Sequence, residues 1–428
     1  MNSKLFSFIK KCPTPFHAVQ TLENELNEKG FIKLCESENT PVEKGKSYYI
    51  TRNMSSIIAF KIPSDDYSGF MISASHCDSP CFSIKENAEV KNGTYVRLST
   101  EKYGGMLLST WLDRPLSIAG RIICETENGA ETRLVDFEEC SAVIPNVAIH
   151  MNRSANENAS YNMAVDMIPL FCDSQSDVDF NSMLSEKAGI EKEKILSSEL
   201  FLYNNQDGIE WNDYISAPRL DDLQCVFACK EAFLQSENSN CVTVLAVFDN
   251  EEVGSSTKQG ADSTFLYDTL KRINESFGKS DTDYNCSLAD SFMLSCDNAH
   301  AVHPNHPELS DSNHSVYMNK GVVIKYNANR KYTSDGVSSA VFKKIAKEAG
   351  VPVQIYCNRA DIVGGSTLGN ISNTHVSLNT VDIGLPQLAM HSAFETAGRE
   401  DTIFMIKAVS SFYGKRIISE KNGSFIIE

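Results

Sequence analysis

The sequence lacks closely paired cysteines, long apolar runs and an excess of basic residues. None of its thirteen cysteines forms a C-x-x-C pair, which argues against a structural zinc module or a disulfide framework and for free thiols in a reducing compartment. No apolar run approaches the length of a membrane span, and residues 1–11 lack the apolar core of a signal peptide. With a net charge of −17, the chain has no basic footprint for nucleic acid or an anionic membrane. We expect a soluble, cytoplasmic protein that binds neither.

The chain is long enough for two or three structural units. Its 428 residues include 42% apolar side chains, enough for a real core, and no low-complexity tract. Residues 90–153 form short alternating segments broken by Asn92-Gly93, Gly104-Gly105 and Asn128-Gly129, a pattern typical of antiparallel hairpins. Elsewhere strand-like and helical patterns alternate: the expected strands are 56–62, 70–75, 241–248, 291–295, 353–356 and 376–381, and the expected helices are 15–29, 220–234, 335–350 and 402–413.

This alternation predicts an α/β fold, with a mixed sheet covered by helices and a β-rich insertion. We expect residues 1–88 plus 215–428 to form the α/β domain, and residues 89–214 to form the inserted domain. The faces of a hairpin-rich module need partners, so we expect the insert to serve dimerisation.

Two neighbouring acids, Glu251 and Glu252, follow the buried-strand pattern 241–248. Side by side at a strand end they repel each other and lose solvation, so a compensating interaction is needed. A divalent metal ion held by one carboxylate, with the other free to move a proton, would supply it. For this pair taken alone, a solvated turn is the alternative.

Other candidate ligands also follow apolar strands or open a helix. Open α/β sheets place ligand sites at the C-terminal ends of their strands, so residues far apart in sequence can converge there. Each residue alone has a structural explanation, such as a buried hydrogen-bonded histidine or an acid at a helix start. Together, two histidines and three carboxylates indicate a metal centre. The candidates are His76, Asp221 or Asp222, Glu252, Asp297 and His391.

This mixture of ligands suits a pair of divalent metal ions. Two ions about 3.5 Å apart need a bridging carboxylate and a terminal ligand on each ion. Imidazole plus carboxylate suits zinc, while carboxylate-rich sites also accept manganese or cobalt. Such a pair lowers the pKa of water toward neutrality, and a glutamate that is not a ligand can take the proton and pass it to the leaving amine. Glu251 and Glu252 can supply one base and one ligand.

A series of short motifs makes a family resemblance specific. In their order along the chain they resemble the aspartyl aminopeptidase family of dinuclear-zinc metallo-aminopeptidases, in a bacterial form, and the likeness covers nearly the whole sequence. It implies a zinc-exopeptidase-like catalytic domain. The motifs are Pro15-Phe-His-Ala-Val19, Ser75-His-Cys-Asp-Ser-Pro80, Pro218-Arg-Leu-Asp221, Asp249-Asn-Glu-Glu-Val-Gly-Ser255, Ser295-Cys-Asp-Asn-Ala-His-Ala-Val-His-Pro304 and Met390-His-Ser392.

The resemblance implies a role for each residue of the metal centre. Asp221 would be the bridging ligand and Glu252 a carboxylate ligand, with Glu251 as the general base. Asp78 would orient a histidine ligand from behind. The terminal ligands implied are His76, Asp297 and His391.

Further positions match substrate-contacting residues of the family. His150 corresponds to a histidine that reaches a neighbouring subunit's active site, where it would stabilise the reacting carbonyl oxygen or lie close enough to the metals to act as a ligand. A surface histidine is the alternative for it. Lys325 corresponds to a residue thought to meet an acidic substrate side chain; an ordinary strand-end lysine is the alternative. The other implied pocket residues are His300, His303 and Tyr332.

The implied function is release of the N-terminal residue from small peptides, with Asp or Glu preferred. Residues 358–363 depart from the family's usual pattern, which leaves the acidic preference open. An N-acyl amino acid deacylase on the same metal core and a catalytically silent assembly protein are the alternatives. The resemblance also implies a closed homo-oligomer, a dodecamer built from dimers.

Overall fold

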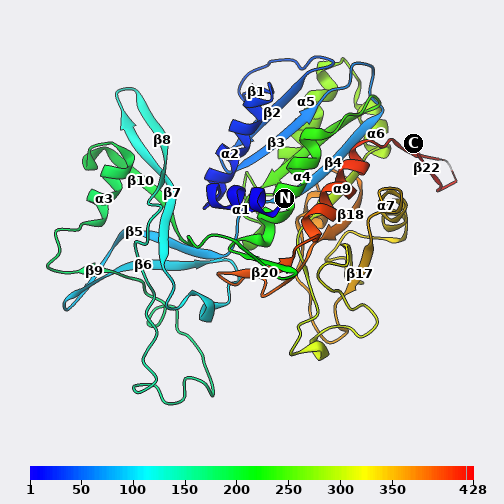
Figure 1. Cartoon of the computed structure of the whole chain (residues 1–428). Helices are drawn as coiled ribbons and strands as arrows, with labels where there is room; N and C mark the ends of the chain where they lie inside the picture. Colours follow the sequence, from blue (N-terminus) through cyan, green and yellow to red (C-terminus); the bar gives the residue numbers. More distant parts are fainter. Residues whose placement is uncertain (421) are drawn as a thin grey trace.

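A nine-stranded mixed sheet forms the centre of the molecule in the computed structural model, which describes residues 1–420 and 422–428 (Figure 1). The strand order is β1-β2-β3-β13-β4-β14-β18-β16-β17, and β13, β4, β14 and β18 run parallel to one another. Parallel neighbours end at the same edge, so the residues that follow them lie close together. The strands are β1 (Ile32–Leu34), β2 (Ser47–Arg52), β3 (Ser56–Lys61), β4 (Gly69–His76), β13 (Cys241–Phe248), β14 (Phe292–Cys296), β16 (Val322–Tyr326), β17 (Val353–Cys357) and β18 (Asn379–Gly384).

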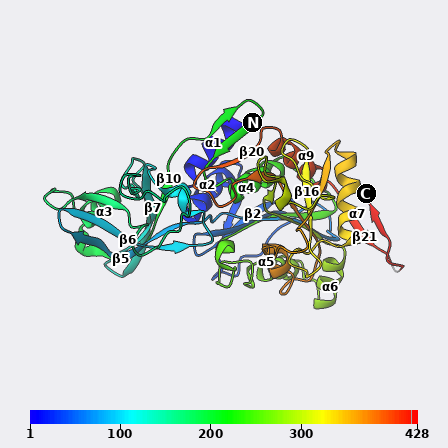
Figure 2. The same ribbon diagram turned by 90° about the horizontal axis from the view of Figure 1, so that it is seen from below.

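Helices cover both faces of this sheet. Strand β13 is buried along its whole length: Leu245 and Val247 belong to the core under one helical layer, and Val244 and Ala246 to the core under the other. This two-sided burial explains the continuous apolar run in the sequence. Figure 2 shows α4 and α9 on one side of the sheet and α5 and α6 on the other. The first layer is α1 (Asn2–Lys11), α2 (Pro15–Glu28), α4 (Leu220–Gln235), α7 (Gly336–Glu348) and α9 (Asp401–Tyr413); the second is α5 (Phe265–Ser276), α6 (Asp281–Ala289) and α8 (Leu368–Ser372).

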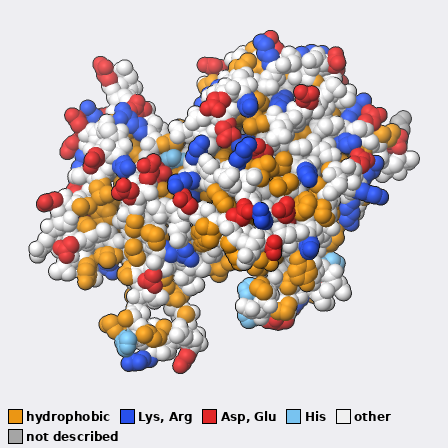
Figure 3. Space-filling view, viewed as in Figure 1, with side chains coloured by type: hydrophobic (Ala, Val, Ile, Leu, Met, Phe, Trp, Pro, Cys, Tyr) orange, Lys and Arg blue, Asp and Glu red, His pale blue; other side chains and the backbone are white. Residues whose placement is uncertain are grey.

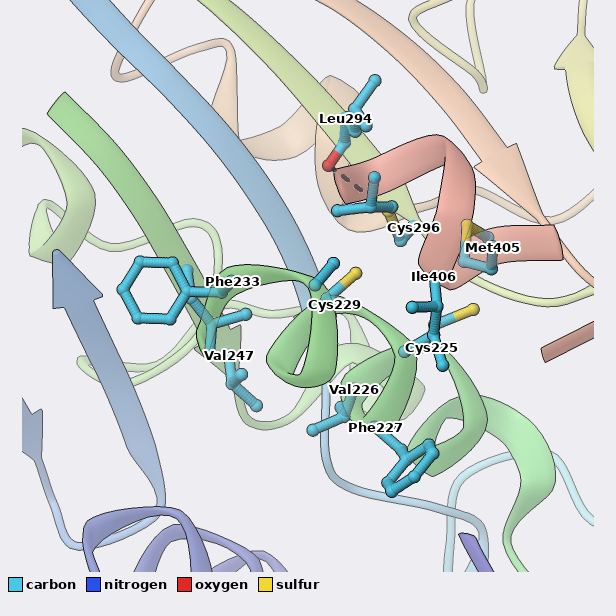
Figure 4. Packing of buried hydrophobic residues seen from close by; sticks show 14 of the residues in the cluster. Cys225, Val226, Phe227, Cys229, Phe233, Val247, Leu294, Cys296, Met405 and Ile406 are labelled. Atoms are coloured by element: carbon cyan, nitrogen blue, oxygen red, sulfur yellow. Dashed lines mark hydrogen bonds between the residues drawn. The ribbon is translucent and has the colours of Figure 1, made fainter. Parts of the chain in front are cut away.

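Helix α4 is anchored in the core beside the sheet. Figure 4 shows its Cys229 and Phe233 among Val247 of β13, Cys296 of β14 and Met405 of α9. All five side chains are fully buried, and burying a large apolar side chain stabilises a fold by about 2 kcal/mol. This packing fixes the first turn of α4, which carries Asp221, against the ends of the strands.

The β-rich unit is a six-stranded antiparallel sheet in the order β8-β7-β10-β5-β6-β9, on the left of Figure 1. It has a core of its own, in which the rings of Phe82 and Trp111 meet edge to face at 5.2 Å. Helix α3 (Phe180–Ala188) packs beside β8. The strands are β5 (Cys81–Asn92), β6 (Tyr95–Tyr103), β7 (Leu116–Thr126), β8 (Gly129–Asp136), β9 (Leu170–Asp173) and β10 (Ile195–Asn204).

A smaller five-stranded sheet joins the segments around the metal-ligand candidates. Strand β12 leads into α4, while β19 and β20 flank the loop that carries His391. A separate hairpin is formed by β21 (Ile417–Ser419) and β22 (Phe425–Ile427). The strands of the small sheet, in order, are β11 (Ile209–Trp211), β12 (Tyr214–Ala217), β20 (Glu395–Gly398), β19 (Pro386–Leu388) and β15 (Ala299–His300).

The expected α/β fold with a β-rich insertion is confirmed. One predicted strand is misplaced, because β18 occupies Asn379–Gly384 rather than 376–381. The N–H of Val376 donates to the carbonyl oxygen of Ser372 at 3.0 Å, so Val376 is buried from a helical turn and not from a strand. Among the described residues, none of the helices has the length and apolar character needed to span a bilayer.

Candidate metal centre

Five ligand-type side chains converge at the C-terminal edge of the central sheet. His76 is the last residue of β4, Asp297 follows β14, and Glu252 lies in a short 3-10 helix after β13. Asp221 comes from the first turn of α4, and His391 from the loop between β19 and β20. The strand ends thus bring together residues from five separate segments, as expected for an open α/β sheet.

Asp221 lies between the two histidines. Its Oδ1 is 3.6 Å from Nε2 of His76, and its Oδ2 is 3.6 Å from Nε2 of His391. Nε2 of His76 is also 3.9 Å from Oδ1 of Asp297, and Nε2 of His391 is 3.4 Å from Oε2 of Glu252. One carboxylate therefore faces two sets of ligand atoms with its two oxygens.

Two ligand groups can be defined by the distances between their donor atoms. In each group, the atoms all lie within 4.8 Å of one another. The first group is His76, Asp221, Asp222 and Asp297; the second group is Asp221, Glu252 and His391. Asp221 alone belongs to both groups, and Glu251 belongs to neither. Glu252 thus lies among the ligand atoms, whereas its neighbour Glu251 lies beside them.

Three carboxylates of this centre are short of positive charge. Burial raises the pKa of Glu252 and of Asp222 well above the usual range, and raises the pKa of Glu251 to about 8. Oδ1 of Asp221, Oδ1 of Asp222 and Oε1 of Glu252 are buried without a hydrogen-bond partner. Buried acids need a counter-charge or a donor, and crowded imidazole and carboxylate atoms suit a divalent cation. The donor set therefore fits metal ions.

The histidines of the centre are held through their second ring nitrogen. Nδ1 of His76 lies 3.1 Å from the carbonyl oxygen of Asp78 and 3.3 Å from its Oδ1, and Nδ1 of His391 lies 2.7 Å from the carbonyl oxygen of Gly105. In both rings this contact directs Nε2 toward Asp221. Such contacts fix the tautomer and the ring orientation of a metal-binding histidine.

Asp78 also fixes the turn that carries the two glutamates. Its Oδ1 accepts the backbone N–H of Glu251 and its Oδ2 the backbone N–H of Glu252, both at 3.1 Å. The turn begins at Asn250, whose φ of 63° lies in the left-handed region. His391 has φ 66°. Non-glycine residues in this region carry strain and cluster at functional sites.

Of the expected pocket residues, Lys325 contacts the first group directly. Nζ of Lys325 donates to the carbonyl oxygen of Asp297 at 2.9 Å, to its Oδ2 at 3.1 Å and to the carbonyl oxygen of Asn298 at 3.2 Å. The same Nζ is 5.2 Å from the centre of the Tyr332 ring, and both side chains are buried. Lys325 thus compensates charge at Asp297, and its three N–H donors already have acceptors.

His300 and His303 line a neighbouring cavity of about 300 Å³. Gly364 and Gly365 lie in its wall, so the chain directly after residues 358–363 faces this cavity. The guanidinium of Arg359, which also lines it, pairs with Asp361. One guanidinium and two imidazoles therefore line this cavity.

His150 lies outside both ligand groups of its own chain. It is exposed on the loop between β8 and β9 of the insert, beside three exposed apolar side chains: Val147 at 50%, Ile149 at 44% and Met151 at 83% exposure. In Figure 3 hydrophobic side chains appear on the part of the insert that projects downward. A loop of this composition is typical of an interface.

The sequence offers Asp222 only as an alternative to Asp221 and assigns no role to Glu395. Asp222 joins the first group, and its peptide bond with Asp221 is cis. Glu395 accepts hydrogen bonds from the backbone N–H groups of both Asp221 and His391. Asp222 is marked in the sequence only by its neighbour Asp221. Glu395 follows His391 by four residues, and no pattern marks it.

Comparison with known proteins identifies the family. A family model described as Aminopeptidase I zinc metalloprotease (M18) matches residues 8–413. The chain is 44% identical over 424 residues to an M18 family aminopeptidase 2 of Clostridium novyi, covering 96% of this chain and 98% of the relative. Its fold is similar to Ape4 in a cryo-EM complex with Nbr1 (TM-score 0.92, 35% identity, 96% of this chain and 84% of that one). It is also similar to the S. cerevisiae mApe1 dodecamer (TM-score 0.84, 26% identity, 96% and 95%).

These similarities favour a peptidase over the deacylase and the catalytically silent assembly protein. They extend over nearly the whole chain, including every segment that contributes to the candidate metal centre. The chain belongs to the M18 family of zinc metalloproteases and is a metallo-aminopeptidase.

Proposed function

We propose that this aminopeptidase uses two divalent ions, zinc foremost with manganese or cobalt as substitutes, bridged by Asp221. The observation that carries this proposal is that Asp221 belongs to both ligand groups and turns one oxygen toward each histidine. His76 and Asp297 would complete one ion's protein ligands, and Glu252 and His391 the other's. Three unpartnered buried carboxylate oxygens support the assignment.

Glu251 is the proposed general base. Bound zinc would polarise the scissile carbonyl and lower the pKa of a water molecule. Glu251 lies beside the ligand groups without belonging to either, and its backbone N–H is held by Asp78 at 3.1 Å. From this position its carboxylate takes a proton from water and passes it to the leaving amine of the peptide. Asp78 would hold His76 and the turn with Glu251 and Glu252 in fixed positions relative to each other.

Glu251→Gln tests this assignment most directly. The amide keeps the shape of the side chain but cannot accept a proton, so kcat should fall by about 10²- to 10⁴-fold, the usual contribution of a general base. Metal content should stay at the wild-type value, because Glu251 is not among the ligand atoms. A variant that retains its activity would refute the base assignment, and one that loses metal would make Glu251 a ligand.

The substrate pocket is proposed to lie between Lys325, Tyr332, His300 and His303. Lys325 is buried beside Asp297, and the two histidines line the adjacent cavity. The ammonium of Lys325 would favour small peptides whose first residue is acidic. Because all its N–H donors already have acceptors, such a side chain would be attracted by charge rather than by a free donor.

The active assembly is proposed to be a dodecamer built from dimers, in which the insert mediates dimerisation. Residues 89–214 would form this dimerisation domain, and residues 1–88 plus 215–428 the catalytic domain. The likeness to a dodecameric relative supports a closed oligomer, and the exposed apolar loop around His150 supports an interface there. His150 would enter the partner's active site and stabilise the developing oxyanion, or contact its metal ions.

We also propose that the enzyme acts in the cytoplasm. All thirteen cysteines are free thiols, and seven of them are buried. Such usage suits a reducing compartment. Fractionation of the source cells, with activity recovered from the cytoplasm and not from a secreted fraction, is the expected result.

A further inference from the structure

Glu395 connects the two segments that form most of the second ligand group. It is the first residue of β20 and is 2% exposed. Its Oε2 accepts the backbone N–H of Asp221 at 3.0 Å, and its Oε1 accepts the backbone N–H of His391 at 2.8 Å. A third donor, Nε2 of Gln387, lies 3.3 Å from Oε1. One carboxylate thus holds the main chain at two metal-ligand candidates.

Both N–H groups need this acceptor. Asp221 lies in the first turn of α4, where backbone N–H groups have no helical partner, and its φ and ψ of −83° and 109° are not helical. His391 has φ 66°, a conformation that non-glycine residues keep only when their surroundings enforce it. Hydrogen bonds to a carboxylate are stronger than neutral ones, so Glu395 can stabilise both backbone conformations.

The first ligand group has supports of its own. His76 is held by Asp78, and Asp297 by the ammonium of Lys325. Among its members only Asp221 is bound by Glu395. In the second group, by contrast, Glu395 holds the main chain of two of the three ligands, Asp221 and His391, while Glu252 is positioned through Asp78. Gly105 holds only the ring of His391.

We propose that Glu395 is a positioning residue that sets the distance between Asp221 and His391 and thereby the affinity of the second ligand group for its ion. The inference rests on the proposed two-ion site. Loss of the Glu395 carboxylate should weaken the binding of the two ions unequally, because only the second group loses the placement of two ligands. Residues behind metal ligands commonly contribute about 10- to 100-fold in affinity.

Zinc titration of the chelator-stripped full-length protein tests this inference, with Glu395→Gln as the variant. The amide is isosteric but offers one acceptor oxygen and turns an NH2 toward the other N–H. The wild type should bind two zinc ions per chain. In the variant, the affinity for one ion should stay unchanged, and the affinity for the other should fall about tenfold or more. Glu400→Gln is the matched control, since this glutamate precedes α9 with an exposed side chain.

Glu395→Asp provides a second variant that retains the charge. It is one methylene shorter and cannot reach both N–H groups, so it should show the same selective loss. The zinc concentration for half-maximal activity should rise about tenfold in both variants and stay unchanged in Glu400→Gln. Equal weakening of both ions, or two unchanged affinities, would overturn the positioning role while leaving the two-ion site intact. A wild type that binds fewer than two ions would overturn the proposed site itself.

Discussion

The hydroxyl of Tyr103 donates a hydrogen bond to Oδ2 of Asp78 at 2.7 Å. Tyr103 ends β6 of the inserted sheet, whereas Asp78 lies behind His76 at the edge of the central sheet. The same Oδ2 accepts the backbone N–H of Glu252. The inserted sheet therefore contacts the candidate metal centre within its own chain, in addition to any role at a subunit interface.

Tyr103→Phe should lower kcat/KM about tenfold. The change removes the hydrogen bond to the buried carboxylate of Asp78 and also the acceptor for Nδ2 of Asn250 at 3.0 Å. Losing such contacts behind a metal ligand costs about 10- to 100-fold. Steady-state kinetics on metal-saturated protein measure the effect. Tyr95→Phe is the control, because Tyr95 begins the same strand and is 56% exposed. Equal kcat/KM in the two variants would mean that the hydrogen bond to Asp78 does not matter for activity.

Two inactive variants should restore activity when their subunits are mixed. Glu251→Gln lacks the proposed base but retains His150, and His150→Ala lacks the histidine but retains the proposed base. If His150 acts in the partner's site, an oligomer reassembled from both proteins contains sites with an intact base and an intact partner histidine. Activity should rise from near zero to about a quarter of the wild-type value for random dimers, because half of the dimers are mixed and each has one complete site.

The control for this experiment is each variant dissociated and reassembled alone. Recovery only in the mixture supports action between subunits. If His150→Ala is fully active by itself, or if the mixture stays inactive although mass measurements show mixed oligomers, His150 does not act in trans.

Lys325→Met should reduce activity toward an aspartyl substrate more than toward a leucyl substrate. The variant loses the charge that would favour an acidic side chain, and it also loses the contacts to Asp297, so both activities fall. We expect the ratio of the two kcat/KM values to change about tenfold, which corresponds to about 1.4 kcal/mol. Lys343→Met, on an exposed face of α7, should change neither value. An unaltered ratio would restrict Lys325 to supporting Asp297.

His17 should make the fold less stable as the pH falls from about 6.5 to about 4. Burial lowers the pKa of this histidine to about 4, so the folded protein keeps it neutral while the unfolded chain already binds a proton below 6.5. The stability is complete above the unfolded pKa and is lost progressively down to the folded pKa, by up to about 3 kcal/mol.

Urea unfolding at several pH values measures this effect in the wild type and in His17→Gln. The variant should lose less stability than the wild type between pH 6.5 and 4, because it has no group to protonate there. His306→Gln, which removes an exposed histidine, should follow the wild type. Parallel curves for wild type and His17→Gln would contradict the role of this partly buried imidazole.

Much of the fold and of the centre could be predicted because strand ends are visible in a sequence. Strand β13 shows as a continuous apolar run, and His76 and Asp297 directly follow such runs. The predicted position of β18 differs from the observed one by three residues, because a buried valine in a turn has the same sequence pattern as a valine in a strand.

The supporting contacts could not be read in the same way. Glu395 acts on backbone N–H groups, which leave no trace in residue type, and Tyr103 reaches Asp78 from another sheet. Two donors of Lys325 bind the carbonyl oxygens of Asp297 and Asn298 and the third binds the Asp297 carboxylate. These contacts depend on the path of the main chain, which residue spacing does not reveal. Motifs therefore indicate which residues meet, whereas the structure indicates which of them hold the others in place.

The metal content of three single variants tests the bridging role of Asp221 most directly. Elemental analysis of zinc-reconstituted, gel-filtered protein should give two ions per chain for the wild type, one for His76→Ala, one for His391→Ala and none retained for Asp221→Ala, because only Asp221 belongs to both ligand groups. One ion in the wild type, or two ions retained by Asp221→Ala, would contradict a metal pair bridged by this aspartate.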